Sequence, residues 1–211
     1  MLKLFRASSL SEIMTDPKSK GEILSVGAKS AITRMAKEFI YGFKEEVSSK
    51  YMEKGLRVED QSIQLLNSVL LTDFVKNQER RNNEWITGEA DIVGGDRIID
   101  IKSSWSLKTF PALAADGMDK DYEWQGRAYM MLWDKPYFEI AYCMVSTPED
   151  LIGYEQKSMH LVDGIERDLR VTIVSYERDL ELEEKIKIKV NAARAYLEEI
   201  IEQITKEHFY G

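Results

Sequence analysis

Hydrophobic residues recur with helical spacing along the first third of the chain. Residues 25–46 and 50–71 both carry this pattern, which predicts two long helices. The stretch SSLSEIM predicts a shorter helix before them, because Ser9 and Glu12 stand at capping-box spacing and Pro17 ends the segment. The N-terminal part is therefore expected to be helical.

The pattern changes to alternating apolar and polar residues between residues 74 and 104. DFVKNQ, EWITGEADIV and RIIDIKSS are predicted as strands, and Gly94-Gly95 between the last two is a strong signal for a two-residue hairpin. Further on, DKDYEWQGRAYMMLWD predicts a helix, and PYFEIAYCMV and RVTIVSY predict strands. The tail from Arg178 to His208 is interpreted as a long amphipathic helix. Its stripe is expected to serve packing and consists of Ile186, Val190, Leu197, Ile201 and Ile204.

A chain of 211 residues that is 44% hydrophobic can fill one core but is short for two domains. No repeat, low-complexity tract or linker rich in proline and glycine interrupts it. We therefore expect a single domain over residues 1–211. The first ten residues lack the apolar run of a secretory signal and no stretch reaches membrane-spanning length, so we expect a soluble, cytoplasmic protein.

The few cysteine and histidine residues narrow the kinds of metal site that the chain can build. Cys143, the single cysteine, lies in an apolar run and is expected to be a buried thiol. One thiol excludes iron–sulfur clusters, and His160 and His208 are too few and too scattered to complete a zinc site. Any metal must therefore be a hard ion held by oxygen atoms.

Charge is unevenly distributed along the chain. The net charge of -8 argues against a protein that coats nucleic acid by charge alone. Residues 1–58 nevertheless hold 11 Lys and Arg against 7 Asp and Glu, whereas residues 112–211 hold 12 against 21. An anionic ligand is therefore expected to approach the N-terminal part.

The predicted hairpin concentrates charge on one face. With a two-residue Gly-Gly loop, strand alternation puts Asp91, Asp100 and Lys102 on the same face, with the two acids as diagonal neighbours roughly 7 to 8 Å apart at the backbone. A divalent cation between the acids would convert their repulsion into shared coordination. The residues also fit a solvated hairpin in which Arg97 and Lys102 pair with the acids.

Other polar residues could join such a site. Glu59 falls on the stripe predicted for residues 50–71, which consists of Leu56, Ile63, Leu66 and Leu70. A carboxylate there needs a partner or a metal, unless its stem carries the charge out to solvent. Gln125 and Tyr129 share one face of the helix predicted over residues 119–134, although packing at the edge of the core is the alternative for Tyr129.

Together these residues resemble the PD-(D/E)xK nuclease superfamily, and within it the phage-recombination exonucleases of the lambda exonuclease (YqaJ-like) type. The matching elements, in the family's order, are Gly55-xxx-Glu59, Asp91, Asp100-Ile101-Lys102 and Gln125-xxx-Tyr129. RASSLSEIMTDPKSKG is also similar to the family's N-terminal stretch, and the likeness covers about residues 5 to 145. The sequence departs from the superfamily pattern at Ala90, where proline is often found.

The resemblance implies an α/β (α+β) fold with a restriction-endonuclease-like core, in which helices flank a mixed central β-sheet. It also implies one or two Mg²⁺ or Mn²⁺ ions in each active site. The ligands that it implies are Glu59, Asp91, Asp100 and the carbonyl of Ile101. Lys102 would orient or help to deprotonate the attacking water, and Gln125 and Tyr129 would hold the nucleophile or the DNA backbone.

The resemblance further implies a route for DNA across the surface. Arg6 and Ser8 would grip a terminal 5′ phosphate, although helix capping is the alternative for Ser8. A basic lane through this acidic protein would be built from Lys76, Arg80, Arg81, Lys108 and Arg127. Trp105 could stack on a base, or it could fill a gap in the core.

The implied function is a metal-dependent deoxyribonuclease that degrades linear double-stranded DNA, 5′ to 3′, and leaves single-stranded tails for phage-type recombination. The same chemistry would serve an endonuclease or a single-strand nuclease in repair or restriction, and the fold could also bind DNA without cleaving it. By resemblance, the partners would be duplex DNA ends, further copies of the chain in a trimer, and a single-strand annealing protein. The setting would be the cytoplasm of a bacterial or phage-infected cell.

Overall fold

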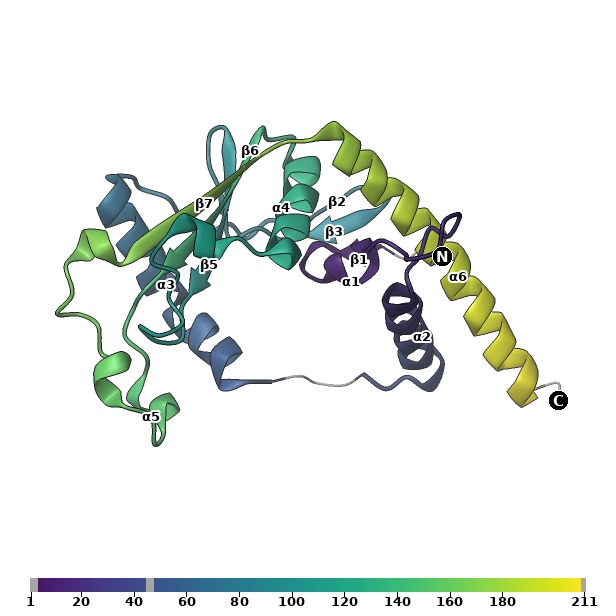
Figure 1. Cartoon of the computed structure of the whole chain (residues 1–211), viewed down its shortest axis with the longest axis horizontal. Coiled ribbons are helices and arrows are strands. Elements are labelled where there is room, and N and C mark those ends of the chain that lie inside the picture. The colour runs from purple at the N-terminus through teal and green to yellow at the C-terminus, as the bar shows by residue number, and fades with distance from the viewer. Residues whose placement is uncertain (1–3, 45–47, 210–211) are drawn as a thin grey trace.

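The computed structural model describes residues 4–44 and 48–209, and over these residues it contains two β-sheets flanked by helices (Figure 1). The larger sheet has the order β4-β5-β6-β7, formed by Ile92–Val93, Arg97–Ser103, Tyr137–Cys143 and Val171–Glu177. Its central strands β5 and β6 run parallel, and the outer pairs are antiparallel. The smaller sheet, β1-β3-β2, consists of Phe5–Arg6, Ile86–Gly88 and Arg81–Asn82. The predicted mixed α/β fold is confirmed.

Helices cover both faces of the larger sheet. On one face, α3 (Lys50–Leu70) contributes Val58 and Leu66 to a hydrophobic cluster that also contains Ile99 and Ile101 of β5. On the other face, α4 (Lys120–Trp133) forms a second cluster with the sheet. Because successive strand residues point to opposite faces, Asp100 projects towards α4 while its neighbours Ile99 and Ile101 project towards α3.

Three further helices extend the core beyond α4. α1 (Ser11–Met14) and α2 (Val26–Tyr41) pack with the C-terminal α6 (Leu180–Phe209), which lies alongside α2 (Figure 1). The predicted stripe of α6 faces this core, which confirms that the tail serves packing. The remaining short helices are η1 (Ala7–Ser9), η2 (Ala114–Gly117), α5 (Glu149–Ile152), η3 (Lys157–Met159) and η4 (Arg167–Leu169).

A glycine sets the distance between α4 and the sheet. A side chain at Gly126 would overlap the ring of Phe138 on β6, so only glycine allows the helix to approach this closely. Gln125, the neighbouring residue on α4, is thereby brought within hydrogen-bonding distance of Asp100. The close packing of this helix therefore shapes one side of the acidic face.

Two predicted strands differ from the observed ones. DFVKNQ forms no strand. Asn77 instead makes isolated hydrogen bonds: its main-chain N–H donates to the Asp91 carbonyl and its side-chain amide donates to the Ala90 carbonyl. EWITGEADIV is divided into β3 and β4, which belong to different sheets. The other predicted strands, PYFEIAYCMV and RVTIVSY, are confirmed as β6 and β7.

The predicted helix ends also differ in part. Ser9 does not cap α1, which follows Leu10; its hydroxyl instead faces the Arg6 carbonyl at 3.5 Å within the preceding 3₁₀ turn. The helix predicted over residues 25–46 ends at Tyr41, because Gly42 adopts a left-handed conformation with φ of 63°. Residues 45 and 46 of that prediction lie outside the described residues.

Cys143 is a buried free thiol, as expected, and burial raises its pKa to about 12. In the part of the chain that the structure describes, no helix has both the length and the apolar character needed to cross a membrane.

Candidate active site

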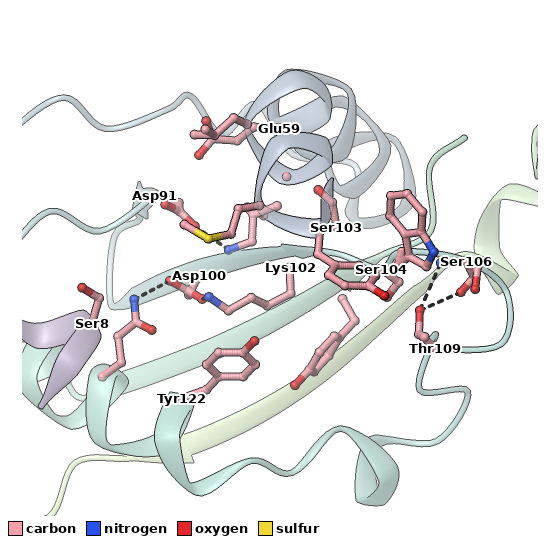
Figure 2. A pocket seen from close by; sticks show the side chains of 18 of the residues that line it. Ser8, Glu59, Asp91, Asp100, Lys102, Ser103, Ser104, Ser106, Thr109 and Tyr122 are labelled. Atoms are coloured by element: carbon pink, nitrogen blue, oxygen red, sulfur yellow. Dashed lines mark hydrogen bonds and ion pairs between the residues drawn. The ribbon is translucent and has the colours of Figure 1, made fainter. Parts of the chain in front are cut away.

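A cleft of about 980 Å³ opens between α3, the end of β5 and α4 (Figure 2). A smaller cleft of about 260 Å³ adjoins it. Most of the residues singled out in the sequence line the larger cleft: Ser8, Glu59, Asp91, Asp100, Ile101, Lys102, Lys108 and Gln125. The smaller cleft adds Arg6, Lys76, Arg80 and Tyr129. Residues from five separate segments of the chain therefore converge on one surface.

Asp91 and Asp100 lie opposite each other across the β4–β5 hairpin. Ile92 pairs with Ile99, and one further step along this register brings Asp91 to Asp100. The Oδ2 atom of Asp91 accepts a hydrogen bond of 2.7 Å from the main-chain N–H of Ile101. The acids are thus cross-strand neighbours, and the predicted diagonal arrangement is wrong.

The turn of this hairpin lies one residue further along the chain than predicted. The N–H of Gly94 donates to the Arg97 carbonyl at 2.9 Å, so that Gly95 and Asp96 form the turn. The strand pairing therefore shifts by two residues from the predicted register. Because a shift of two preserves the alternation of faces, both acids remain on the same face.

The surroundings of Asp91 raise its cost of ionisation. Burial raises the pKa of Asp91, and the negative charge of Asp100 raises it further. The hydrogen bond from Ile101 and the positive charge of Lys102 oppose this effect only in part. Asp91 is therefore poised to gain from a cation that neutralises the pair.

Lys102 is the positive partner of Asp100. Its Nζ atom lies 2.6 Å from Oδ2 of Asp100, and 4.2 Å from the ring centroid of Tyr122 (Figure 2). Burial by itself would lower the pKa of Lys102, but the charge of Asp100 and its contact with the ammonium outweigh burial and raise the pKa. Lys102 therefore remains protonated in the metal-free protein.

Gln125 and Tyr129 form a buried hydrogen-bonded pair behind Asp100. The amide of Gln125 donates to Oδ1 of Asp100 at 3.2 Å and to the hydroxyl of Tyr129 at 2.9 Å. That hydroxyl in turn donates to the Glu89 carbonyl at 3.0 Å. Burial raises the pKa of Tyr129, so its hydroxyl stays protonated. Both residues support Asp100 from α4.

Glu59 faces the cleft from α3, but it does not lie on the apolar stripe that was predicted for this helix. Leu56 is 78% exposed, so the predicted stripe is wrong at this position, and the buried face of α3 instead runs through Val58 and Leu66. Glu59 lies at the edge of that face, with 18% of its side chain exposed, and forms an ion pair with Lys76.

The acids fit a hard divalent ion through Asp91 and Asp100. Oδ2 of Asp100 is buried and lies 2.6 Å from the ammonium of Lys102, so an ion would share this oxygen with the lysine. Within residues 4–44 and 48–209, no three Asp, Glu, His or Cys side chains stand close enough together to hold an ion. Two carboxylates suit Mg²⁺ or Mn²⁺, which keep several water ligands, and Glu59 could join them only if it leaves Lys76.

The candidate phosphate-binding residues divide into two groups. Arg6, Ser8 and Lys108 are exposed and line the clefts. Lys76 and Arg80 also line the smaller cleft, where they pair with Glu59 and Glu89. Arg6, Lys76 and Arg80 therefore share the smaller cleft with Asp91.

Arg127 does not belong to this surface, and its predicted role in DNA binding is corrected. It is 8% exposed and pairs with Glu123 on its own helix, and it also donates to the main-chain carbonyl of Glu177. Its position two residues after Gln125 turns it away from the sheet face that carries Asp100. Arg81 pairs with Glu79 and lines neither cleft.

Sequence reasoning singled out Trp105 but missed its neighbours on the cleft wall. The wall continues beyond Lys102 through Ser103, Ser104, Trp105 and Ser106, and Glu155 completes it from the connection between β6 and β7. Trp105 is 7% exposed and its indole N–H donates to Glu155 at 3.0 Å, so it both fills the core edge and lines the cleft. A run of serines directly after DIK was a usable signal, whereas nothing local pointed to Glu155.

Comparisons with known proteins agree with this geometry. No protein-family model and no curated protein sequence matches the chain. In fold, the chain is similar to an alkaline exonuclease (LHK-Exo) from Laribacter hongkongensis, with a TM-score of 0.70 at 17% identity over 98% of this chain and 93% of that chain. The same enzyme in complex with dAMP gives a TM-score of 0.69 at 18% identity, with the same coverage.

A further solved structure is similar in sequence as well as in fold. It is a phage-related exonuclease from Haemophilus somnus 129PT, with a TM-score of 0.91 and 35% sequence identity over 97% of each chain. Identity at this level over nearly the full length of both proteins means that the chain belongs to the family of phage-related exonucleases.

Proposed function

We propose that this protein is a metal-dependent deoxyribonuclease of the PD-(D/E)xK type, which degrades linear duplex DNA from its ends in the 5′ to 3′ direction. The observation that carries the proposal is the opposition of Asp91 and Asp100 with Lys102 beside them in an open cleft. Membership in the family of phage-related exonucleases supports the reaction class.

The two aspartates are the groups that would hold Mg²⁺ or Mn²⁺, joined by the Ile101 carbonyl and by Glu59 once it leaves Lys76. When bound, such an ion lowers the pKa of the attacking water and neutralises the phosphate. Gln125 fixes one oxygen of Asp100 and so orients the other towards the cleft. Asp100 is buried and Asp91 is half-buried, so bulk water has limited access to the two acids.

Lys102 would orient the attacking water and stabilise the charge that develops on the phosphate. Its raised pKa argues against direct removal of a proton by the amine, because a protonated lysine cannot act as a base. The ring of Tyr122 and the Asp100 carboxylate restrict its ammonium to one region of the cleft. A fixed positive charge of this kind acts without reorganisation during the reaction.

The smaller cleft would receive the terminal 5′ phosphate. Arg6 and Arg80 offer guanidinium groups and Ser8 a hydroxyl, which suit the three oxygens of a phosphate monoester. Because Ser8 and Asp91 line both clefts, a phosphate held there would lie next to the acids. This arrangement supports attack near a 5′ end.

The test is digestion of end-labelled linear duplexes, with and without a 5′ phosphate, in Mg²⁺, in Ca²⁺ and with a chelator. We expect stepwise loss of the 5′ label in Mg²⁺, faster with the phosphate, and none with the chelator. Closed-circular duplex serves as the control. Cutting of the circle would assign an endonuclease, and digestion that persists in the chelator would refute metal dependence.

A further inference from the structure

Lys54 is a buried lysine of α3 that contacts none of the candidate catalytic groups. It is 1% exposed, and its ammonium donates to three main-chain carbonyls: Ser104 at 2.5 Å, Trp105 at 3.2 Å and Val145 at 2.9 Å. Burial lowers the pKa of Lys54 to about 8, so the fold bears a cost for keeping an amine at this position. The hydrogen bonds that the amine donates to the three carbonyls offset this cost.

These carbonyls lie where the central strands end. The last pair of the β5–β6 ladder is Ser103 with Cys143, and the three carbonyls belong to residues that follow this pair on the two chains. One ammonium therefore ties α3 to the segments that follow both β5 and β6. Main-chain carbonyls at the end of a ladder need other donors, and Lys54 supplies them from the neighbouring helix.

The segment held by Lys54 is the far wall of the cleft. Ser104, Trp105 and Ser106 all line it, directly after Lys102. The Trp105 carbonyl also accepts a hydrogen bond of 2.8 Å from the hydroxyl of Thr147, which fixes the same point from a second side. The position of this wall thus depends on donors that lie outside β5.

We propose that Lys54 is a positioning residue, which holds the wall formed by Ser104–Ser106 where it meets the substrate strand. This inference rests on the proposed function, because the wall serves the same cleft. Asp100 and Lys102 are held independently, since the β5–β6 ladder pairs them with Ile140 and Tyr142. Loss of Lys54 therefore displaces the wall and leaves the reacting groups in place.

The test is steady-state digestion of linear duplex by Lys54→Met, which keeps the length of the side chain but removes its donors. We expect KM for DNA ends to rise about tenfold, equivalent to the loss of roughly 1.4 kcal/mol of binding, while kcat changes less than about threefold. If Lys54 served stability alone, the effects would be reversed. A partly unfolded sample contains less active enzyme, so the apparent kcat would fall while KM stayed constant.

Lys189→Met is the matched control. Lys189 is also a buried lysine, with 4% of its side chain exposed. It donates to the carbonyl of Thr15, directly after α1, at 2.9 Å and lies 3.6 Å from Asp16; none of these residues lines the larger cleft. Its loss should lower thermal stability, as the loss of Lys54 does, but leave KM unchanged. An unchanged KM for Lys54→Met, or an equal change in both variants, would overturn the proposal.

Trp105 fluorescence separates this inference from the proposed function. Subtracting the spectrum of the matching Trp105→Phe variant isolates Trp105, whose emission should move to longer wavelength in Lys54→Met and not in Lys189→Met. If the unmodified protein degrades no DNA, the proposed function fails, while this shift still supports the wall contact and its absence refutes it. If Lys54→Met does not fold, Thr147→Val is the substitute test, because it removes the other donor to the Trp105 carbonyl. A rise in KM of about twofold or more supports the proposal, and a smaller rise overturns it.

Discussion

Lys102 and Asp100 project from the same face of β5, with Nζ of the lysine 2.6 Å from Oδ2 of the aspartate. Asp91 stands opposite on the neighbouring strand, so two negative charges and one positive charge share a largely buried site. When both acids are ionised, the site therefore carries one uncompensated negative charge before any cation binds. This imbalance makes stability and activity respond differently to substitution.

Asp100→Asn should stabilise the metal-free protein while removing its activity. The amide is isosteric and relieves the repulsion that raises the pKa of Asp91, so we expect the melting temperature in chelator to stay equal or rise by a few degrees. Nuclease activity in Mg²⁺ should fall on the order of 100-fold or more, as for loss of an essential metal-site group. Thermal melts and end-label release measure the two effects. Unchanged DNA degradation would show that Asp100 is dispensable.

Lys102→Met should lower both the melting temperature of the metal-free protein and the nuclease activity. Without the ammonium, Asp91 and Asp100 face each other uncompensated, so the melting temperature in chelator should fall, opposite to the effect of Asp100→Asn. Activity should also fall by about 100-fold or more, because the fixed positive charge near the phosphate is lost. The two variants measured side by side control for each other. A higher melting temperature for Lys102→Met would contradict the charge balance described above.

The contribution of Asp91 to the stability of the metal-free protein should decrease as pH rises above about 4. The folded-state pKa of Asp91 lies above the ordinary value of 3.8, so between the two values the folded protein binds more protons than the unfolded chain. The contribution of this group is therefore full below the unfolded value and is lost as pH rises through the folded one. Urea unfolding of both proteins in chelator isolates this contribution: the stability of the unmodified protein relative to Asp91→Asn should decline as pH rises.

Mg²⁺ should stabilise the folded protein if Asp91 is one of its ligands. At neutral pH, Mg²⁺ at about 100 times its Kd should stabilise the unmodified protein by roughly 2.7 kcal/mol, and Asp91→Asn by much less. Equal pH profiles for the two proteins would show that Asp91 is not the group responsible.

Tyr129→Phe separates support of Asp100 from direct participation. The hydroxyl contacts Gln125 and the Glu89 carbonyl, so its loss should cost about 0.5–1.5 kcal/mol of stability and reduce kcat by less than about tenfold. Gln125→Leu, which removes the direct donor to Asp100, should reduce kcat more strongly. Urea unfolding and end-label release give both numbers. A larger loss of kcat in Tyr129→Phe would assign the hydroxyl a role in the reaction itself.

Lys108 and Arg127 should respond in opposite ways to alanine substitution. Lys108 is exposed at the cleft, so Lys108→Ala should weaken DNA binding, reduce the salt dependence of KM by about one phosphate contact, and leave the melting temperature unchanged. Arg127 is buried between Glu123 and the Glu177 carbonyl, so Arg127→Ala should lower the melting temperature without changing the salt dependence. A salt effect in Arg127→Ala would restore its predicted contact with DNA.

Local patterns in the sequence anticipated the elements that bear the site. Helical spacing located α3, α4 and α6, and alternation located β5, β6 and β7, because these periods follow directly from backbone geometry. The shared face of Asp91, Asp100 and Lys102 was also predicted, and it survived an error in the hairpin turn since the register moved by an even number of residues. Assignment of a chemical role to these residues came from resemblance, and it stays a prediction.

Tertiary packing determined which face of each helix is buried and which side chains meet, and local sequence patterns do not encode these contacts. The rotation of α3 exposed Leu56 and buried Lys54, because the neighbouring layer determines which face of a helix is covered. Packing against Phe138 brought Gln125 to Asp100, while Arg127 on the same helix was turned away to Glu123. The sequence by itself determined the secondary structure and the common face of the acids, since both depend on local periodicity. Which charges meet across the cleft was decided only by the packing of helices against the sheets. Those charges belong to segments far apart in the chain, and the number of residues between two segments does not determine their distance in space.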